Sequence, residues 1–170
     1  MFIIIFSSSG IVLTSLTLIP KEFNHVAIVL VLISLVLPDM LKSFYDENWE
    51  EVSSHLRSPV EQSGGRYRLE DVFHSIYNGD YHLWIVLDDK IVAAAVTGFT
   101  DYPRKRMLTC HFLGGSRMDE WVEDMDVIFE KWARDHGASG IELTGRKGWG
   151  RALDKLGWKQ SFFVTEKNYE

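Results

Sequence analysis

The stretch that decides the fold lies near the C-terminus, at Gly140–Trp158, and reads G-I-E-L-T-G-R-K-G-W-G-R-A-L-D-K-L-G-W. Its apolar start, Ile141–Leu143, predicts a short strand, which three glycines then end: Gly145, Gly148 and Gly150. The apolar residues of Arg151–Leu156 share one face of a helix, and Gly157 supplies the left-handed residue at which helices commonly stop. Trp158 then opens a further strand. The stretch therefore predicts a strand, a glycine-rich connection, a short helix and a strand, in that order.

The segment just before this stretch carries the strongest helical pattern in the chain. Apolar residues recur every three or four positions along it: Met118, Trp121, Val122, Met125, Ile128, Phe129, Trp132, Ala133 and His136. Ser116 is suited to the N-cap, with Asp119 as its reciprocal partner, and Gly137 ends the segment. We expect a helix over Arg117–His136 whose apolar stripe lies against a sheet.

Three further strands are expected upstream. Tyr81–Leu87 and Ile91–Phe99 flank a tight turn and predict a hairpin. Met107–Leu113 predicts the next strand, after a basic loop at Tyr102–Arg106. Because the long helix connects this strand to Ile141–Leu143, the two strands should be parallel neighbours.

Two amphipathic helices are expected before the hairpin. Trp49, Val52 and Leu56 have helical spacing, and Ser58-Pro59 is expected to end that helix. Leu69–Tyr77 repeats the amphipathic pattern. This order of elements predicts an α/β fold, with one mixed sheet and helices on both of its faces.

Residues 1–39 form an apolar extension, so we expect a globular domain over residues 40–170. Phe2–Pro20 carries no charge and barely reaches the roughly 20 apolar residues that a spanning helix needs. His25–Leu37 is a second apolar run, too short to span a bilayer alone. Three interpretations stay open: a membrane anchor made of one transmembrane helix or a short hairpin, an uncleaved leader, or a misassigned start with translation beginning at Met40. A helical hairpin buried in the core is disfavoured.

The composition excludes several classes of function. The 170 residues carry a net charge of −6, which argues against nucleic-acid binding through phosphate contacts. Cys110 is the single cysteine, so no intrachain disulfide can form, and a reducing compartment fits. No group of cysteines and histidines has metal-ligand spacing, so the sequence predicts no metal site.

This order of elements resembles the GNAT fold of N-acetyltransferases, over about Met40 to the C-terminus. The most specific part of the likeness is Lys155-Leu156-Gly157-Trp158, which is similar to the K-x-G-F signature at the end of that family's last helix. A narrower likeness to phage-encoded GNAT-like proteins rests on four features: Leu83-Trp84, the loop Asp101–Arg106, the strand end Phe112–Gly115, and Gly145–Trp149. The resemblance implies acetyl-CoA as the cofactor and an amine as the acceptor.

The resemblance also implies where the cofactor binds. The loop that GNAT enzymes use to hold the CoA pyrophosphate falls at Gly114, Gly115, Ser116 and Arg117. N–H groups at a helix start can bind an anion, but acids crowd the first turns here: Asp119, Glu120, Glu123 and Asp124. Arg146 and Arg151 lie in a basic corner around Trp149, which suits anion binding as well as it suits a solvated surface.

Two residues are candidates for catalysis. Glu142, on the strand before the short helix, is a candidate general base, although a lone glutamate on a strand more often faces solvent. Many GNAT enzymes place an acid tyrosine at the position that Leu153 holds here, and leucine donates no proton. Tyr169 is the candidate substitute.

Two functions follow from the resemblance, and the sequence leaves both open. The first is an N-acetyltransferase that moves an acetyl group from acetyl-CoA to the amine of a small molecule or a protein. The second is a non-catalytic module of the same fold, used in phage assembly or another interaction and tethered to a membrane through residues 1–37. We expect either protein at the cytoplasmic face.

Overall fold

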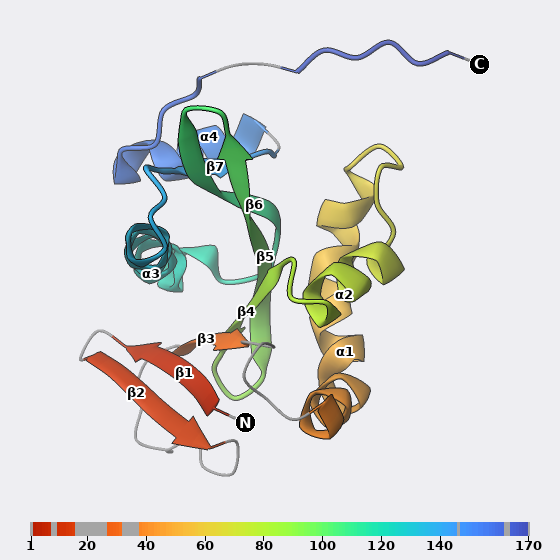
Figure 1. The fold of residues 1–170 in the computed structure, drawn as a ribbon, viewed down its shortest axis with the longest axis vertical. Coiled ribbons are helices and arrows are strands. Elements are labelled where there is room, and N and C mark those ends of the chain that lie inside the picture. Colours follow the sequence, from red (N-terminus) through yellow and green to blue (C-terminus); the bar gives the residue numbers. More distant parts are fainter. Residues whose placement is uncertain are drawn as a thin grey trace.

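A mixed sheet forms the centre of the molecule (Figure 1). The computed structural model describes residues 2–7, 10–15, 27–31, 38–145, 147–161 and 164–169. The strand order is β2-β1-β3-β4-β5-β6-β7, for β1 (Phe2–Ser7), β2 (Gly10–Ser15), β3 (Ala27–Val31), β4 (His82–Leu87), β5 (Ile91–Tyr102), β6 (Lys105–Gly115) and β7 (Ile141–Leu143). Every neighbouring pair is antiparallel except β6 and β7, which are parallel. The predicted hairpin and the predicted parallel pair are confirmed.

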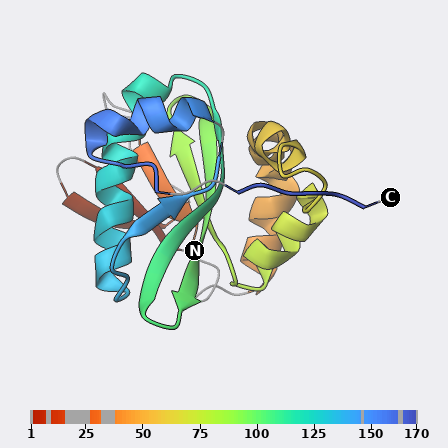
Figure 2. The same ribbon diagram turned by 90° about the horizontal axis from the view of Figure 1, so that it is seen from above.

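Helices cover both faces of this sheet, as predicted (Figures 1 and 2). One face carries the first two helices and the other face carries the last two: α1 (Pro38–Glu61), α2 (Leu69–Tyr77), α3 (Val122–Asp135) and α4 (Lys147–Leu153). Two 3-10 turns, η1 (Met118–Glu120) and η2 (Asp154–Leu156), precede α3 and follow α4. The fold is therefore α/β, with one sheet between two layers of helices.

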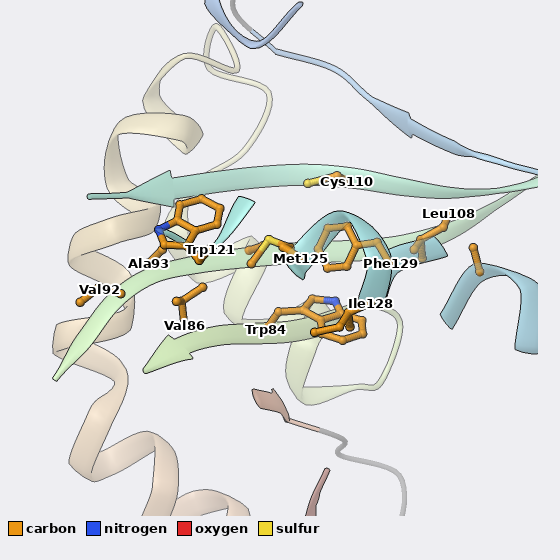
Figure 3. Close-up of a cluster of buried hydrophobic side chains, with 12 residues drawn as sticks. Trp84, Val86, Val92, Ala93, Leu108, Cys110, Trp121, Met125, Ile128 and Phe129 are labelled. Carbon is orange, nitrogen blue, oxygen red and sulfur yellow. The ribbon is translucent and has the colours of Figure 1, made fainter. Parts of the chain in front are cut away.

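The sheet is buried on both faces, because successive residues of β4 point to opposite sides. Leu83 and Ile85 pack with buried side chains of α1 and α2. Trp84 and Val86 pack on the other face, against α3 (Figure 3). From the α3 side, that cluster receives Trp121, Met125, Ile128, Phe129 and Ala133, with Trp132 partly buried beside them. The apolar stripe predicted for this segment is confirmed.

Pro59 lies inside α1 and does not end it, so that prediction is wrong. A proline has no N–H, so the carbonyl of His55, four residues earlier, lacks its usual partner within the helix. This carbonyl faces β6 closely: a Cβ placed on Gly114 would lie 2.2 Å from the oxygen and 2.8 Å from the Pro59 ring. α1 therefore continues past Pro59 at the point where the helix packs closely against Gly114.

The helical segment after β6 begins later than predicted. The N–H of Ser116 donates to the carbonyl of Val92 at 2.8 Å, so Ser116 is held by β5 rather than placed at a helix start. Arg117 then adopts the left-handed region with φ 56°, η1 follows, and α3 begins only at Val122. The cap predicted from Ser116 and Asp119 is therefore wrong.

The short helix α4 begins earlier than predicted. It starts at Lys147, so Gly148 and Gly150 lie inside it and do not break the chain. Each glycine costs a helix roughly 0.5–1 kcal/mol. The packing of Trp149 against the cluster around α3 offsets that cost, because burying a large apolar side chain contributes about 1.5–3 kcal/mol. Gly157 ends η2 with φ 83°, as predicted.

No strand forms in residues 158–161 or 164–169, so the strand predicted from Trp158 is not found in this part of the chain. Trp158 is bound to α3 instead, where its Nε1–H donates to Oδ1 of Asp126 at 2.7 Å. Its backbone N–H bonds to the carbonyl of Leu153 at 3.3 Å. These two bonds direct the chain across α3 rather than along β7.

The predicted domain boundary at Met40 falls within α1. Before it, β3 pairs with β4 from Ala27 opposite Leu87 to Val31 opposite Leu83. Residues 16–26 and 32–37, which hold parts of both apolar runs, lie outside the described residues. Within the described ranges, no helix combines the length and the apolar character that crossing a bilayer requires.

Candidate functional site

A cleft opens where β6 and β7 diverge. β7 pairs only with Leu108–Cys110 of β6, and beyond Cys110 the two chains part. The cleft has a volume of about 610 Å³ and reaches from this gap to the end of α1 and the turn after it. Its lining includes the polar residues Gln62, Ser63, Arg66, Tyr67, His111 and Thr144. Apolar walls come from Phe112, Leu113, Leu143 and Trp149.

His111 reaches this cleft because β6 bulges at its position. Opposite β5, Phe112 pairs with Val96 and Cys110 pairs with Thr97, so His111 is the extra residue. A bulge bends the strand and re-aims the side chain that it carries. The ring of Tyr81 stacks on the imidazole, with centroids 4.4 Å apart.

Gly98 provides the room for this stack. A Cβ on Gly98 would lie 2.8 Å from Cδ1 of Tyr81 and 3.0 Å from Nε2 of His111. Both rings therefore lie directly over the glycine on β5. Any larger residue at this position would push the imidazole or the phenol out of place.

The environment of His111 favours a neutral imidazole. Burial lowers its pKa below the ordinary value of 6.5, and the charge of Glu142 opposes this only in part. At neutral pH the ring is therefore unprotonated and is able to accept a proton from a bound ligand. A general base needs this combination of exposure to a cleft and an unprotonated nitrogen.

Tyr81 connects His111 to Tyr67. Burial, and then a hydrogen bond with the Tyr67 side chain, raise the pKa of Tyr81 to about 12. Tyr81 thus keeps its proton at any physiological pH. Tyr67 also lines the cleft, with its ring edge-on to Phe112 at a centroid distance of 5.3 Å. His111 of β6 thus meets two tyrosines from the connections before and after α2.

Glu142 lies behind the cleft rather than in its lining. Its Oε1 accepts hydrogen bonds from the hydroxyl of Tyr102 at 2.9 Å and from Oγ1 of Thr109 at 2.8 Å. The Tyr102 hydroxyl is held protonated by this bond, which raises its pKa. The predicted base is thus half-buried and already accepts two hydrogen bonds, and it acts on the cleft through its charge near His111.

Tyr169 is not brought to the cleft. It is 86% exposed in the C-terminal tail, where the ammonium of Lys167 lies 5.7 Å from its ring. Glu142 and Tyr169, the two residues predicted for catalysis, therefore do not share a site among the described contacts. Leu153, at the position of the family's acid tyrosine, is buried with 6% of its surface exposed.

The glycines of the predicted pyrophosphate loop serve close packing. Gly114, the last residue but one of β6, lies beneath the His55 carbonyl and the Pro59 ring. At Gly115, with φ 152°, a Cβ would lie 2.4 Å from that of Ala93. The N–H of Ser116 is already bonded to Val92. Close packing therefore accounts for glycine at both positions, and no bound anion is needed to explain them.

Arg117 is held by two carboxylates. Its guanidinium donates to Asp88 at 2.5 Å and to both oxygens of Glu120, one of them at 2.9 Å. These bonds raise the pKa of Arg117 and lower the pKa of Glu120. An anion that docks here has to displace at least one of the two acids.

The predicted basic corner is described only in part. Arg146 lies outside the described residues, and Arg151 is exposed on α4. Trp149, between them, lines the cleft. In the basic loop, Arg106 is occupied, because it pairs with Asp101 at 3.4 Å and lies 4.5 Å over the Phe99 ring.

Sequence reasoning missed His111 and Tyr67 of the cleft lining, and Tyr81, which contacts both of them. The bulge that exposes His111 arises from pairing with β5, so no pattern of neighbouring residues in the sequence predicts it. The one available signal is a histidine within an otherwise apolar strand, which by itself fits a packed side chain equally well.

No protein-family profile matches the sequence, and no curated protein sequence does. Solved structures match the fold. An aminoglycoside acetyltransferase from an uncultured soil metagenomic sample, in complex with sisomicin, gives a TM-score of 0.58 at 11% identity over 86% of this chain and 98% of its own. A GNAT family acetyltransferase of Staphylococcus aureus gives 0.55 at 14% identity, over 84% and 98%. A predicted acetyltransferase of Clostridium acetobutylicum, with acetyl-CoA, gives 0.51 at 18% identity, over 70% and 90%. The chain therefore has the fold of the GNAT acetyltransferases.

Proposed function

We propose that this protein transfers an acyl group from a CoA thioester to an amine, with His111 as the general base. The observation that carries the proposal is the neutral imidazole at the bulge of β6, placed in the cleft where β6 and β7 part. A base is needed because an amine is protonated at neutral pH and attacks a thioester only after losing a proton. His111 fits that task better than Glu142, which lies outside the lining and already accepts two hydrogen bonds.

Bound acetyl-CoA would supply the activated acyl thioester. His111 would take one proton from the acceptor's ammonium, and the free amine would then attack the thioester carbonyl. As the new C–N bond replaces the C–S bond, Tyr67 would donate its proton to the departing thiolate and recover one from the acylated nitrogen. Tyr81 would hold both side chains in place through its stack on His111 and its hydrogen bond with Tyr67. Tyr67 would thereby take the role of the family's acid tyrosine, whose position Leu153 holds here. Tyr169 would have no part in the reaction.

The cleft fits the two ends of acetyl-CoA unequally. Leu113, Leu143 and Trp149 give an apolar wall that suits the uncharged arm of the thioester. Arg117, which is not among the residues that line the cleft, is the candidate cation for the diphosphate, and Asp88 and Glu120 hold it. We therefore expect acetyl-CoA to bind weakly, in the high-micromolar range or above.

Titration calorimetry with acetyl-CoA and with desulfo-CoA tests this proposal. Arg117→Glu should weaken binding at least tenfold, about 1.4 kcal/mol. Glu120→Gln should tighten it, because one of the competing acids is removed. Glu130→Gln breaks an exposed pair with Arg134 on α3 and is the matched control, with no expected change. If the wild type and Glu120→Gln both fail to bind at millimolar concentration, the enzyme proposal is wrong.

In that case the second candidate applies, a non-catalytic interaction module of the same fold. The observation in its favour is the pairing of Arg117 with two carboxylates at the position where a donor's phosphates would bind. The likeness to phage-encoded proteins and a role in phage assembly belong to this candidate, and both rest on the sequence features alone. A cytoplasmic location with membrane tethering through residues 1–37 is likewise part of the proposal.

A further inference from the structure

The C-terminal tail crosses the mouth of the cleft. Val164 belongs to the lining, and Glu166 forms an ion pair with Arg66, which lies in the lining on the turn after α1. Nη1 of Arg66 also donates to the carbonyl of Ser63 at 2.6 Å, which fixes the guanidinium at this edge. Figures 1 and 2 both show the last described residues, 164–169, on the side of α1 and α2.

The charges in the cleft indicate what kind of ligand it accepts. Among its described lining residues, Arg66 is the one with a permanent charge, and none is a carboxylate. His111, at the inner end, is neutral because burial lowers its pKa. An arginine can donate two parallel hydrogen bonds to a planar carboxylate, and Arg66 already pairs with the carboxylate of Glu166. A polycation would find no lining carboxylate there, whereas a ligand with one carboxylate and one amine matches the cleft.

We propose that Arg66 binds a carboxylate of the acceptor, so that the acceptors of this protein are amines that also carry a carboxylate. Glu166 occupies that place in the free protein, and the tail is a strap that the acceptor displaces. The acceptor's role as an amine in transfer rests on the proposed function. The carboxylate site and the strap do not, because they concern binding alone.

The strap is held weakly enough to be displaced. The paired side chains of Arg66 and Glu166 are 52% and 45% exposed, and Val164 is 71% exposed. Ion pairs this exposed typically change an equilibrium by less than about fivefold. A carboxylate ligand therefore competes with Glu166 at a modest cost in affinity. High salt weakens both the Arg66–Glu166 pair and the binding of the ligand's carboxylate to Arg66.

The test uses the full chain and matched probes. β-Alanine, γ-aminobutyrate and ε-aminocaproate are each titrated into the protein, and so is the carboxamide analogue of each acid. NMR follows the backbone N–H shifts of residues 63–67 and 111–113 in every titration. The wild type should bind the acids more tightly than the amides. Glu166→Gln should tighten binding of the acids about two- to fivefold, and Arg66→Gln should abolish the preference for acids. Glu130→Gln, which removes a similar exposed pair on α3, is the control.

Each outcome decides one part of the proposal. If Arg66→Gln keeps the preference for acids, or if acids and amides bind equally to the wild type, the carboxylate site is wrong. If Glu166→Gln binds the acids no better than the wild type and Glu130→Gln do, the strap is wrong. If the preference holds but no probe is acetylated in the presence of acetyl-CoA, the proposed function fails while the carboxylate site stands.

Discussion

The imidazole of His111 lies against the phenol ring of Tyr81, with the ring centroids 4.4 Å apart and the planes inclined by 26°. This contact holds a bulged residue of β6 in one orientation, and Tyr81 is itself hydrogen-bonded with Tyr67. A base has to be held in position as well as unprotonated, because the rate depends on the geometry of proton transfer. The stack on Tyr81 holds the imidazole in position, and burial keeps it unprotonated.

His111→Gln should lower kcat/KM for amine acetylation by about 10²–10⁴-fold, the usual contribution of a general base. Glutamine keeps the bulk of the side chain, so the melting temperature should change little. In the wild type, the acid limb of the rate should lie below pH 6.5, because burial lowers the pKa of His111 and keeps the imidazole unprotonated down to more acidic pH. A pH profile of kcat/KM measures this acid limb.

Glu142→Gln is the discriminating variant for the same reaction. Removing its charge takes away a contribution that raises the pKa of His111, so the acid limb should move to lower pH while the rate at pH 8 stays similar. If Glu142→Gln instead abolishes the reaction and His111→Gln leaves it intact, the glutamate is the base, as the sequence alone suggested.

Gly114→Ala should destabilise the protein by about 1–3 kcal/mol, because its Cβ would lie 2.2 Å from the backbone oxygen of His55. Gly148→Ala is the matched control. That glycine lies inside α4, and an added Cβ would have no neighbour within 4 Å, so alanine should stabilise the helix by roughly 0.5–1 kcal/mol. Urea unfolding of both variants checks the difference. Equal stability of Gly114→Ala and the wild type would mean that α1 does not press on β6.

The two tryptophans of the α3 side should differ in how much stability the protein loses when each is replaced by phenylalanine. Nε1 of Trp121 donates to the Ser116 carbonyl at 2.8 Å, so Trp121→Phe should cost about 0.5–1.5 kcal/mol through the lost bond, besides the packing lost with the smaller ring. Nε1 of Trp132 is buried and has no hydrogen-bond partner among the described residues. Trp132→Phe removes that unpaired donor, so its cost should stay within about 1 kcal/mol, whereas Trp132→Ala should cost about 3–5 kcal/mol. Thermal denaturation of the three variants ranks them.

The sequence predicted those parts of the fold that periodicity determines. The stripe from Met118 to Ala133 and the strands flanking Asp88-Asp89-Lys90 have strong local patterns. The hairpin formed where it was expected, and the stripe packs as expected although α3 begins only at Val122. The helix–strand order also predicted the parallel pairing of β6 with β7. Each of these features depends on residues that are close in the chain.

The features that could not be predicted depend on contacts between distant residues. Pro59 stays within α1 because Gly114 lies opposite it, and Ser116 leaves the helix because Val92 holds its N–H. The same is true of the site, where the pairing of β5 with β6 creates the bulge at His111. The two predicted catalytic residues, by contrast, are not brought together: Glu142 was predicted from its position on a strand, and Tyr169 as a substitute for the family's acid tyrosine.

Deletion of residues 1–39 tests the predicted start at Met40. That chain lacks β3, so β4 loses its partner from Leu83 to Leu87 and presents an open edge. We expect residues 40–170 to unfold at lower urea concentration than residues 26–170 and to associate as the concentration rises. If both chains are equally stable and monomeric, β3 is dispensable and a start at Met40 gains support. A natural peptide that spans Lys21 would exclude that start.

His82 makes the stability of the α3 face depend on pH. Burial, and then the charge of the nearby His136, lower its pKa to about 4. Its ring meets Trp132 and Phe99 edge-on, at centroid distances of 5.6 and 5.4 Å. Since the unfolded chain binds the proton more readily, near pH 6.5, the neutral ring's contribution is complete above that pH and is lost as the pH falls toward 4.

The expected loss from this one group is roughly 3 kcal/mol between pH 7 and pH 4. His82→Gln cannot titrate, so the difference in unfolding free energy between the wild type and this variant should shrink by that amount over the same range. Urea unfolding at pH 7, 5.5 and 4.5 measures the trend. Carboxylates titrate in both proteins and cancel in the difference. A difference that stays constant with pH would show that His82 is solvated and that α3 does not seal this part of the sheet.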